Sequence, residues 1–348
     1  MLVLLCFLLV PVVYLGAGCL RSQTNTGSEK IALSDELQKQ YVLRPEESTY
    51  LTFSEWYIVY SAEEYAAHLK GNRPSSFPYF SAIGQYWGSY CTVTKITSAE
   101  YGFNISNHLM LYIIGQSFTV ENLFKGVYEN TIGRVSEWFG TPTQEDRYAQ
   151  SANEEYGKFL HSVPLYEFPF HKKLCCLWTK TDLFGMGFVR KWERKIVLSL
   201  EYAVKSGYGY LIKIATKTVL GSADLEITVV TGPFSQAVLD SESRIKLIRQ
   251  EQDKLLIVLP RYEAFTEIVK KEKLPFLEIA GNDEILITVL APSNWNNFPT
   301  GTTEMFSMEI LTKPESKRVA LKVMVSSLSS TLTQLEKEGI QLEHVYDY

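Results

Sequence analysis

The chain has 348 residues, of which 46% are hydrophobic and 21% are charged, and both values are typical of globular domains. Its formal net charge of -5 argues against a general nucleic-acid-binding protein, which would need a basic surface. The five cysteines are too few and too poorly spaced for a disulfide framework, so we expect reduced thiols. The length allows two domains of ordinary size.

The first twenty residues, MLVLLCFLLVPVVYLGAGCL, carry no charge. As a helix this segment would be roughly 30 Å long, which is the thickness of a bilayer's hydrocarbon core. It therefore predicts a transmembrane anchor at residues 1–20 that binds the lipid bilayer. Arg21 and Lys30 follow the segment and favour a cytoplasmic body for a single-pass protein of the bacterial inner membrane.

Three alternatives to a permanent anchor stay open at this point. A cleaved signal peptide would normally begin with a basic residue, and none precedes Leu2. Residues 15–19, LGAGC, resemble the lipobox of a lipoprotein signal, but the leucine stands one place too far upstream. The third alternative is a late start that omits a basic head.

Residues 21–50 are polar and predict a tether with a short helix at Leu33–Tyr41. The aromatic and branched run Trp56–Tyr60 is typical of a strand, and Ser61 suits the N-cap of a following helix. We expect residues 51–221 to form a mainly helical, aromatic-rich domain and residues 222–348 to form an α/β domain.

Within the helical domain, Thr143 is a candidate N-cap for a helix that ends before Pro164. The segment after it, PLYEFPFHKKLCCLWTK, suggests an irregular connection. Residues 188–221 predict the longest helix, with an apolar face and a C-cap at Gly221. That face is made by Trp192, Ile196, Leu200, Ala203, Gly207, Tyr210, Leu211 and Ile214.

Charged residues on two of the predicted helices offer weak catalytic candidates. If the helices around 121–134 and 190–205 face one another, they bring together Glu121, Glu129, Arg134, Arg190, Glu193, Glu201 and Lys205. Such a site would belong to an enzyme of unknown reaction, with carboxylates in a buried pocket. The simpler interpretation is that Glu121, Lys125 and Glu129, spaced four apart, form ion pairs within one helix.

Basic and aromatic residues alternate around residues 171–195. Aromatic rings favour the headgroup layer and lysines favour anionic lipid, so this region predicts a second, interfacial contact with the membrane. The candidate residues are Lys172, Lys173, Trp178, Lys191, Trp192, Arg194 and Lys195. The alternative is a solvated helix start whose tryptophans pack inward.

Alternating strand and helix patterns occupy the C-terminal region. After the strand-like ADLEITVVTG and a polar stretch at 241–253 that we interpret as helical, a strand–helix–strand unit occurs twice. Leu255–Leu259 align with Leu321–Val325, and Leu277 aligns with Leu342. A duplicated βαβ unit predicts one antiparallel sheet with both helices on one face, a ferredoxin-like βαββαβ module.

The ending LSSTLTQLEKEGIQLEHVYDY, with a helix closed by Gly339, resembles the second half of ACT-type regulatory modules, which share the ferredoxin-like fold. The resemblance covers about residues 254–348 and implies the binding of an amino acid or another small ligand. The segments FPYF, IGQYW and LYIIGQSFTVE resemble uncharacterised bacterial membrane-anchored proteins, for which no activity follows.

No HExxH, CxxC, GxxxxGK[ST], GxGxxG or GxSxG motif occurs, so we expect neither a metal nor a cofactor. His344 and Asp347 are expected at the surface. The predicted fold class is α+β, with a transmembrane helix, a helical body and a ferredoxin-like module. The function that we favour is a membrane-anchored, non-enzymatic binding or scaffold module that self-associates and senses a small ligand through its C-terminal domain; the alternative is the enzyme described above.

Overall fold

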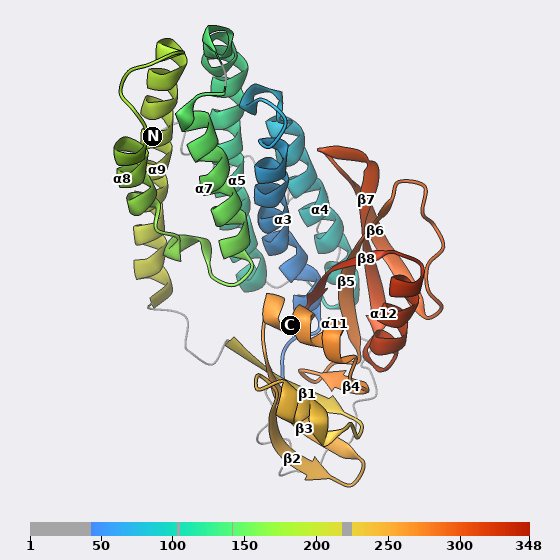
Figure 1. Ribbon diagram of the computed structural model, residues 1–348. Coiled ribbons are helices and arrows are strands. Elements are labelled where there is room, and N and C mark those ends of the chain that lie inside the picture. Colours follow the sequence, from blue (N-terminus) through green and yellow to red (C-terminus); the bar gives the residue numbers. More distant parts are fainter. Residues whose placement is uncertain (1–42, 103–104, 141, 218–224) are drawn as a thin grey trace. The chain divides into compact units, whose positions relative to one another are not determined.

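The computed structural model describes residues 43–102, 105–140, 142–217 and 225–348 (Figure 1). These residues form two compact units, each assembled from separate stretches of the chain. The two-sheet unit takes residues 43–55, 85–116 and 225–348, and the helical unit takes residues 56–84 and 117–217, with the gaps just given. The predicted division into residues 51–221 and 222–348 stays a prediction.

Seven helices precede the first strand in the described part of the chain: α3 (Glu47–His68), α4 (Tyr79–Glu100), α5 (Ile105–Tyr128), α6 (Arg134–Ser136), α7 (Gln144–Leu160), α8 (Phe170–Lys180) and α9 (Phe188–Lys217). The strand-like run 56–60 lies inside α3, so the predicted strand there is wrong. Phe53, Trp56, Tyr57 and Tyr60 are buried, and their spacing of three and four places them on one helical face. Burial on this face outweighs the β propensity of the aromatic residues.

Helix α7 begins as its sequence predicts. The Thr143 hydroxyl accepts a hydrogen bond from the Asp146 amide, and the Asp146 carboxylate accepts one from the Thr143 amide, which completes a capping box. The irregular connection predicted after Pro164 is wrong from Phe170 onward, where α8 begins. Phe170 and Leu177 are buried seven residues apart, and this spacing of two helical turns secures α8 against its neighbours.

The C-terminal part forms two four-stranded antiparallel sheets. The first contains β1 (Glu226–Thr231), β2 (Lys246–Glu251), β3 (Lys254–Pro260) and β4 (Phe276–Ile279) in the order β2-β3-β1-β4. The second contains β5 (Glu284–Pro292), β6 (Thr302–Ile310), β7 (Lys313–Met324) and β8 (Gln341–Tyr346) in the order β6-β7-β5-β8. The helices of this part are α10 (Gln236–Ser241), α11 (Glu263–Glu272) and α12 (Leu328–Lys337).

The two sheets repeat one topology, because β1 to β4 and β5 to β8 occupy the same places in their sheets. In the first sheet β1 pairs antiparallel with both β3 and β4, and α11 connects β3 to β4. In the second sheet β5 pairs in the same way with β7 and β8, and α12 connects those two strands. The predicted ferredoxin-like module is therefore wrong. Each predicted βαβ unit recruits two further strands and forms a sheet of its own, instead of supplying half of a shared sheet.

The polar stretch 241–253 was expected to be helical, but it contains the edge strand β2. This strand pairs with β3 alone, for example Lys246 with Val258. Five of its six residues are exposed. An edge strand needs no apolar face, so its sequence lacks the alternation that would have predicted it.

One core joins both sheets of this unit and includes α11 and α12 residues such as Phe265 and Leu335. His344 and Asp347 are fully buried, so their predicted surface placement is wrong. The His344 Nδ1 atom lies 3.0 Å from the Thr266 hydroxyl, and Arg261 donates to Asp347 at 2.6 Å. These partners allow polar groups to be buried under α11.

In the part of the chain that the structure describes, no helix is long and apolar enough to cross a membrane. The transmembrane helix of the predicted fold class therefore has no counterpart among the described residues. The predicted anchor at residues 1–20, the tether helix at 33–41 and the C-cap at Gly221 lie outside the described residues. The cellular location stays a prediction.

Candidate functional site in the helical unit

Charged side chains of α9 pair with those of the second half of α5 in the helical unit. Lys125 and Lys205 each bridge Glu121 and Glu201, with nitrogen–oxygen distances of 2.8–3.1 Å. Signs alternate around this quartet, so every charge has two opposite neighbours. Aromatic rings enclose it, since the Lys125 nitrogen lies 5.1 Å from the centre of the Tyr65 ring and the Lys205 nitrogen 5.0 Å from that of Tyr156.

The lysines set the ionisation of the quartet. Partial burial on its own would raise the pKa of Glu121, but Lys125 and Lys205 together hold that pKa below its ordinary value. The same balance holds for Glu201. Burial would lower the pKa of Lys125, but the two carboxylates raise it well above its ordinary value. All three groups are therefore charged at neutral pH.

An arginine cluster (Glu129, Asp146, Arg190, Glu193 and Arg194) lies further along the same side of α9. Arg194 donates to Glu129 at 2.8 and 3.2 Å, and Arg190 donates to Asp146 at 2.8 Å. Glu193 pairs with both arginines. Burial raises the pKa of Glu129 in spite of Arg194, and this carboxylate sits where a π-helical turn, Glu129–Gly133, follows α5.

A third group joins Glu145 of α7 to Lys191 and Lys195 of α9, at 3.1 and 3.2 Å. All three side chains are at most 4% exposed. Across the three groups cations and carboxylates are equal in number, because the quartet holds two of each sign, the arginine cluster three carboxylates and two cations, and this group one carboxylate and two cations. A further buried carboxylate, Glu137, lies 4.0 Å from Arg190 and 3.9 Å from Arg73. Balanced pairing permits burial of so many charges.

The structure thus brings together six of the seven catalytic candidates: Glu121, Glu201 and Lys205 in the quartet, and Glu129, Arg190 and Glu193 in the arginine cluster. Arg134 is exposed and belongs to neither group. The predicted pair of Glu121 and Lys125 within α5 is present, but Glu129 pairs across to α9. Since each of these carboxylates is already bonded to a cation, a substrate would have to displace an ion pair in order to use it.

The predicted membrane-interface residues separate into three sets. Lys191, Arg194 and Lys195 are buried in the ion pairs just described, so their charges cannot reach lipid headgroups. Trp178 is partly exposed and donates to Ser199, while Trp192 donates to the Leu183 carbonyl. Lys172 and Lys173 have another setting, because both line a pocket.

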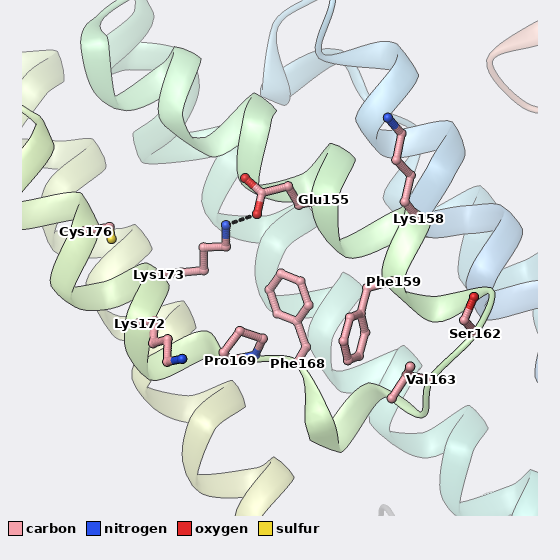
Figure 2. A pocket seen from close by; sticks show the side chains of 10 residues that line it. All are labelled: Glu155, Lys158, Phe159, Ser162, Val163, Phe168, Pro169, Lys172, Lys173 and Cys176. Carbon is pink, nitrogen blue, oxygen red and sulfur yellow. Dashed lines mark hydrogen bonds and ion pairs between the residues drawn. The ribbon is translucent and has the colours of Figure 1, made fainter.

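This pocket has a volume of about 640 Å³ and lies between the end of α7 and the start of α8 (Figure 2). Its lining residues are Glu155, Lys158, Phe159, Ser162, Val163, Phe168, Pro169, Lys172, Lys173 and Cys176. The rings of Phe159 and Phe168 meet edge to face at 5.2 Å. Sequence patterns had indicated the two lysines. Of the two phenyl rings, Phe159 comes from the end of the predicted helix α7 and Phe168 from the segment interpreted as irregular, and neither carries a motif.

Outside the pocket, the helical unit exposes many large apolar side chains. Met186 is 97% exposed, Trp138 75% and Phe184 74%. A ligand site at the C-terminal sheets stays a prediction. No group of metal-binding side chains is present among the described residues. Comparison of the chain with protein-family models, with curated proteins and with solved structures finds no match, so that its function has to be inferred from its own geometry.

Proposed function

We propose that this chain is a non-enzymatic assembly protein that self-associates through the apolar exterior of its helical unit. One observation carries the proposal: α9 is inverted. Between Phe188 and Tyr210 every charged residue is buried or half-buried in an ion pair, and every exposed residue is uncharged. The exposed residues are Phe188, Val189, Ile196, Leu200, Ala203, Val204, Gly207 and Tyr210.

Five residues spaced four apart form a continuous apolar row on α9: Phe188, Trp192, Ile196, Leu200 and Val204. Ile196, Leu200 and Val204 are 61–64% exposed. An apolar face of this kind normally points into a protein core. Here the ion pairs occupy the inner side, so the row points outward.

A second exposed region, the aromatic tip, adjoins the start of this row. It combines residues 183–189 with Trp138 and Phe139. The two segments touch, because a Cβ on Gly187 would lie 3.6 Å from the Phe139 carbonyl oxygen. The Asp182 amide donates to Gln144 at 2.8 Å and the Trp192 indole donates to Leu183 at 3.0 Å, so the tip is held in place at its base.

The exposed area is large for a monomer. An aromatic side chain offers about 150–250 Å², so Trp138, Phe139, Phe184 and Phe188, each at least half exposed, present roughly 400–600 Å². Met186 and the α9 row add to this area. The total approaches the ~800 Å² per partner of a standard protein interface.

A second copy of the chain is the partner that suits this surface best. A row of residues spaced four apart is the ridge that packs into the groove of another helix of the same kind. A two-fold interface requires only one such face, which each copy supplies. The α9 row also lacks the charges that would select a different partner by complementarity.

The test is sedimentation velocity of the purified full chain over a range of concentrations. We expect a dimer that dissociates when Leu200→Glu places a charge in the α9 row. The substitution lies at an exposed position, so the folded monomer should keep its stability within ~0.5 kcal/mol. Ser151→Glu introduces the same charge on the exposed side of α7 and should leave the dimer intact.

A chain that is monomeric at all concentrations, or a dimer that Leu200→Glu leaves unchanged, would contradict the proposal. Binding to phospholipid vesicles that is lost in Leu200→Glu, without any dimer, would assign the row to lipid instead and would also overturn it. Leu200→Ala adds no charge and serves as a second variant should the glutamate impair folding. It should weaken the dimer in the same direction.

A further inference from the structure

The pocket between α7 and α8 differs from the self-association surface, because it combines an apolar floor with positive charge. Phe159, Val163, Phe168 and Pro169 form the floor, and Figure 2 shows the two phenyl rings side by side within it. Its volume of about 640 Å³ falls within the range of small-molecule sites. An aromatic or aliphatic body of moderate size would fill such a space.

The charges around the pocket are predominantly positive. Lys158, Lys172 and Lys173 line it together with one carboxylate, Glu155, although the whole chain carries a net charge of -5. Figure 2 shows the Lys158 side chain directed away from the rings. Lys172 and Lys173 therefore supply the charge nearest to the floor.

Lys173 is placed to meet an anion at the edge of the floor. Its side chain is only 15% exposed, its ammonium group pairs with Glu155, and it lies 5.8 Å from the centre of the Phe168 ring. Its backbone is anchored, because the Tyr148 hydroxyl donates to the Lys173 carbonyl at 2.7 Å. The cation is thus held in position, and its carboxylate partner among the residues that the structure describes is Glu155, itself 58% exposed.

We propose that this pocket binds an amphipathic monoanion, a molecule with an aromatic or aliphatic body and a single carboxylate or sulfonate group. The body would lie against Phe159 and Phe168. The anionic group would bond to Lys173, in competition with Glu155, and would attract Lys172. This binding site is independent of the dimer proposed above, since none of its lining residues belongs to the α9 row.

Isothermal titration of the full chain with 2-naphthoate, and with neutral 2-naphthalenemethanol for comparison, tests the proposal. We expect the anion to bind at least about tenfold more tightly than the alcohol, the difference that one charged hydrogen bond supplies. Lys173→Met removes the cation, keeps an apolar stem and should abolish this preference. Glu155→Gln removes the competing carboxylate and should strengthen binding of the anion several-fold.

Lys180→Met is the matched control, because Lys180 is exposed at the other end of α8 and does not line the pocket. It should bind 2-naphthoate as the unmodified chain does. Equal affinity for the anion and the alcohol would overturn the proposal. So would equal losses in Lys180→Met and Lys173→Met, which would indicate general attraction of the anion to basic surface. Phe168→Leu should weaken the binding of both ligands, because both bodies are expected to lie against the Phe168 ring.

Discussion

Arg194 of α9 donates hydrogen bonds of 2.8 and 3.2 Å to both carboxylate oxygens of Glu129, which lies 65 residues earlier in the chain. Both side chains are buried, at 3% and 7% exposure. This pair shows how the helical unit is built, since its longest helix buries charged side chains beside Leu198 and Tyr202 and exposes a row of apolar ones. Four predictions follow from specific contacts in the two units.

Replacement of Arg194 by methionine should destabilise the helical unit by about 3–5 kcal/mol, because Glu129 would be left buried without its partner. Chemical denaturation followed by tryptophan fluorescence measures the loss, since Trp178 and Trp192 report on this unit. Arg134→Met is the control, because Arg134 is exposed and outside the cluster. It should change the free energy of unfolding by no more than ~0.5 kcal/mol. A similar loss in both variants would contradict the role given to the buried pair.

The helical unit should lose stability as the pH falls below about 4.5. Glu121, Glu145, Glu193 and Glu201 each have a folded-state pKa below the ordinary value of 4.5. Neighbouring cations outweigh the effect of burial, and at Glu145 a hydrogen bond from its own backbone amide contributes more than the hydrogen bond from either lysine. At acidic pH the unfolded chain therefore binds more protons, and protonation favours unfolding. Denaturation measured between pH 6 and 3 should show this decline.

Glu201→Gln should make that decline shallower, since it removes one of the responsible carboxylates. The exposed Glu304→Gln should leave the profile unchanged. A stability that is constant down to pH 3 would show that the ion pairs contribute little.

The two-sheet unit should weaken over a higher pH range because of His344. Burial lowers the pKa of this imidazole from 6.5 in spite of Glu263. A lowered pKa means that the unfolded chain takes up the proton first, so stability is full above about pH 6.5 and is lost below it. The slope should not exceed about 1.4 kcal/mol per pH unit. Hydrogen exchange of the β5 and β8 amides measures this pH dependence. His344→Gln should remove the loss of stability below about pH 6.5, whereas the control His171→Gln should retain it.

Gly115 of α5 should not tolerate a methyl group. A Cβ at this position would overlap the ring of Tyr86, whose hydroxyl donates to the Leu111 carbonyl at 2.7 Å. Gly115→Ala should therefore destabilise the two-sheet unit by about 1–3 kcal/mol. Gly88 of α4 faces open space, and Gly88→Ala should stabilise the chain by about 0.5–1 kcal/mol. The midpoint of thermal unfolding should fall for Gly115→Ala and rise for Gly88→Ala. A shift of the midpoint in the same direction for both variants would refute the close contact between Gly115 and Tyr86.

Sequence patterns were sufficient where a local rule decides the structure. Thr143 and Asp146 stand three residues apart and exchange hydrogen bonds between side chain and backbone, so the start of α7 could be predicted from these residues alone. The similarity between 255–259 and 321–325 revealed the internal repeat. It could not show that each copy completes a sheet of its own, because strand pairing depends on partners such as β1 and the polar edge strand β2, which lie outside the aligned segments.

The sequence by itself determined that α9 has an apolar face and a charged face, because both follow from the helical period of 3.6 residues. Only the tertiary structure decided which face lies inside. Leu200 is exposed and Lys195 is buried because Glu145 of α7 supplies the opposite charge for the lysine, as Glu129 does for Arg194. Periodicity describes one helix, whereas the free energy of burying a charge depends on the partner that another helix brings to it.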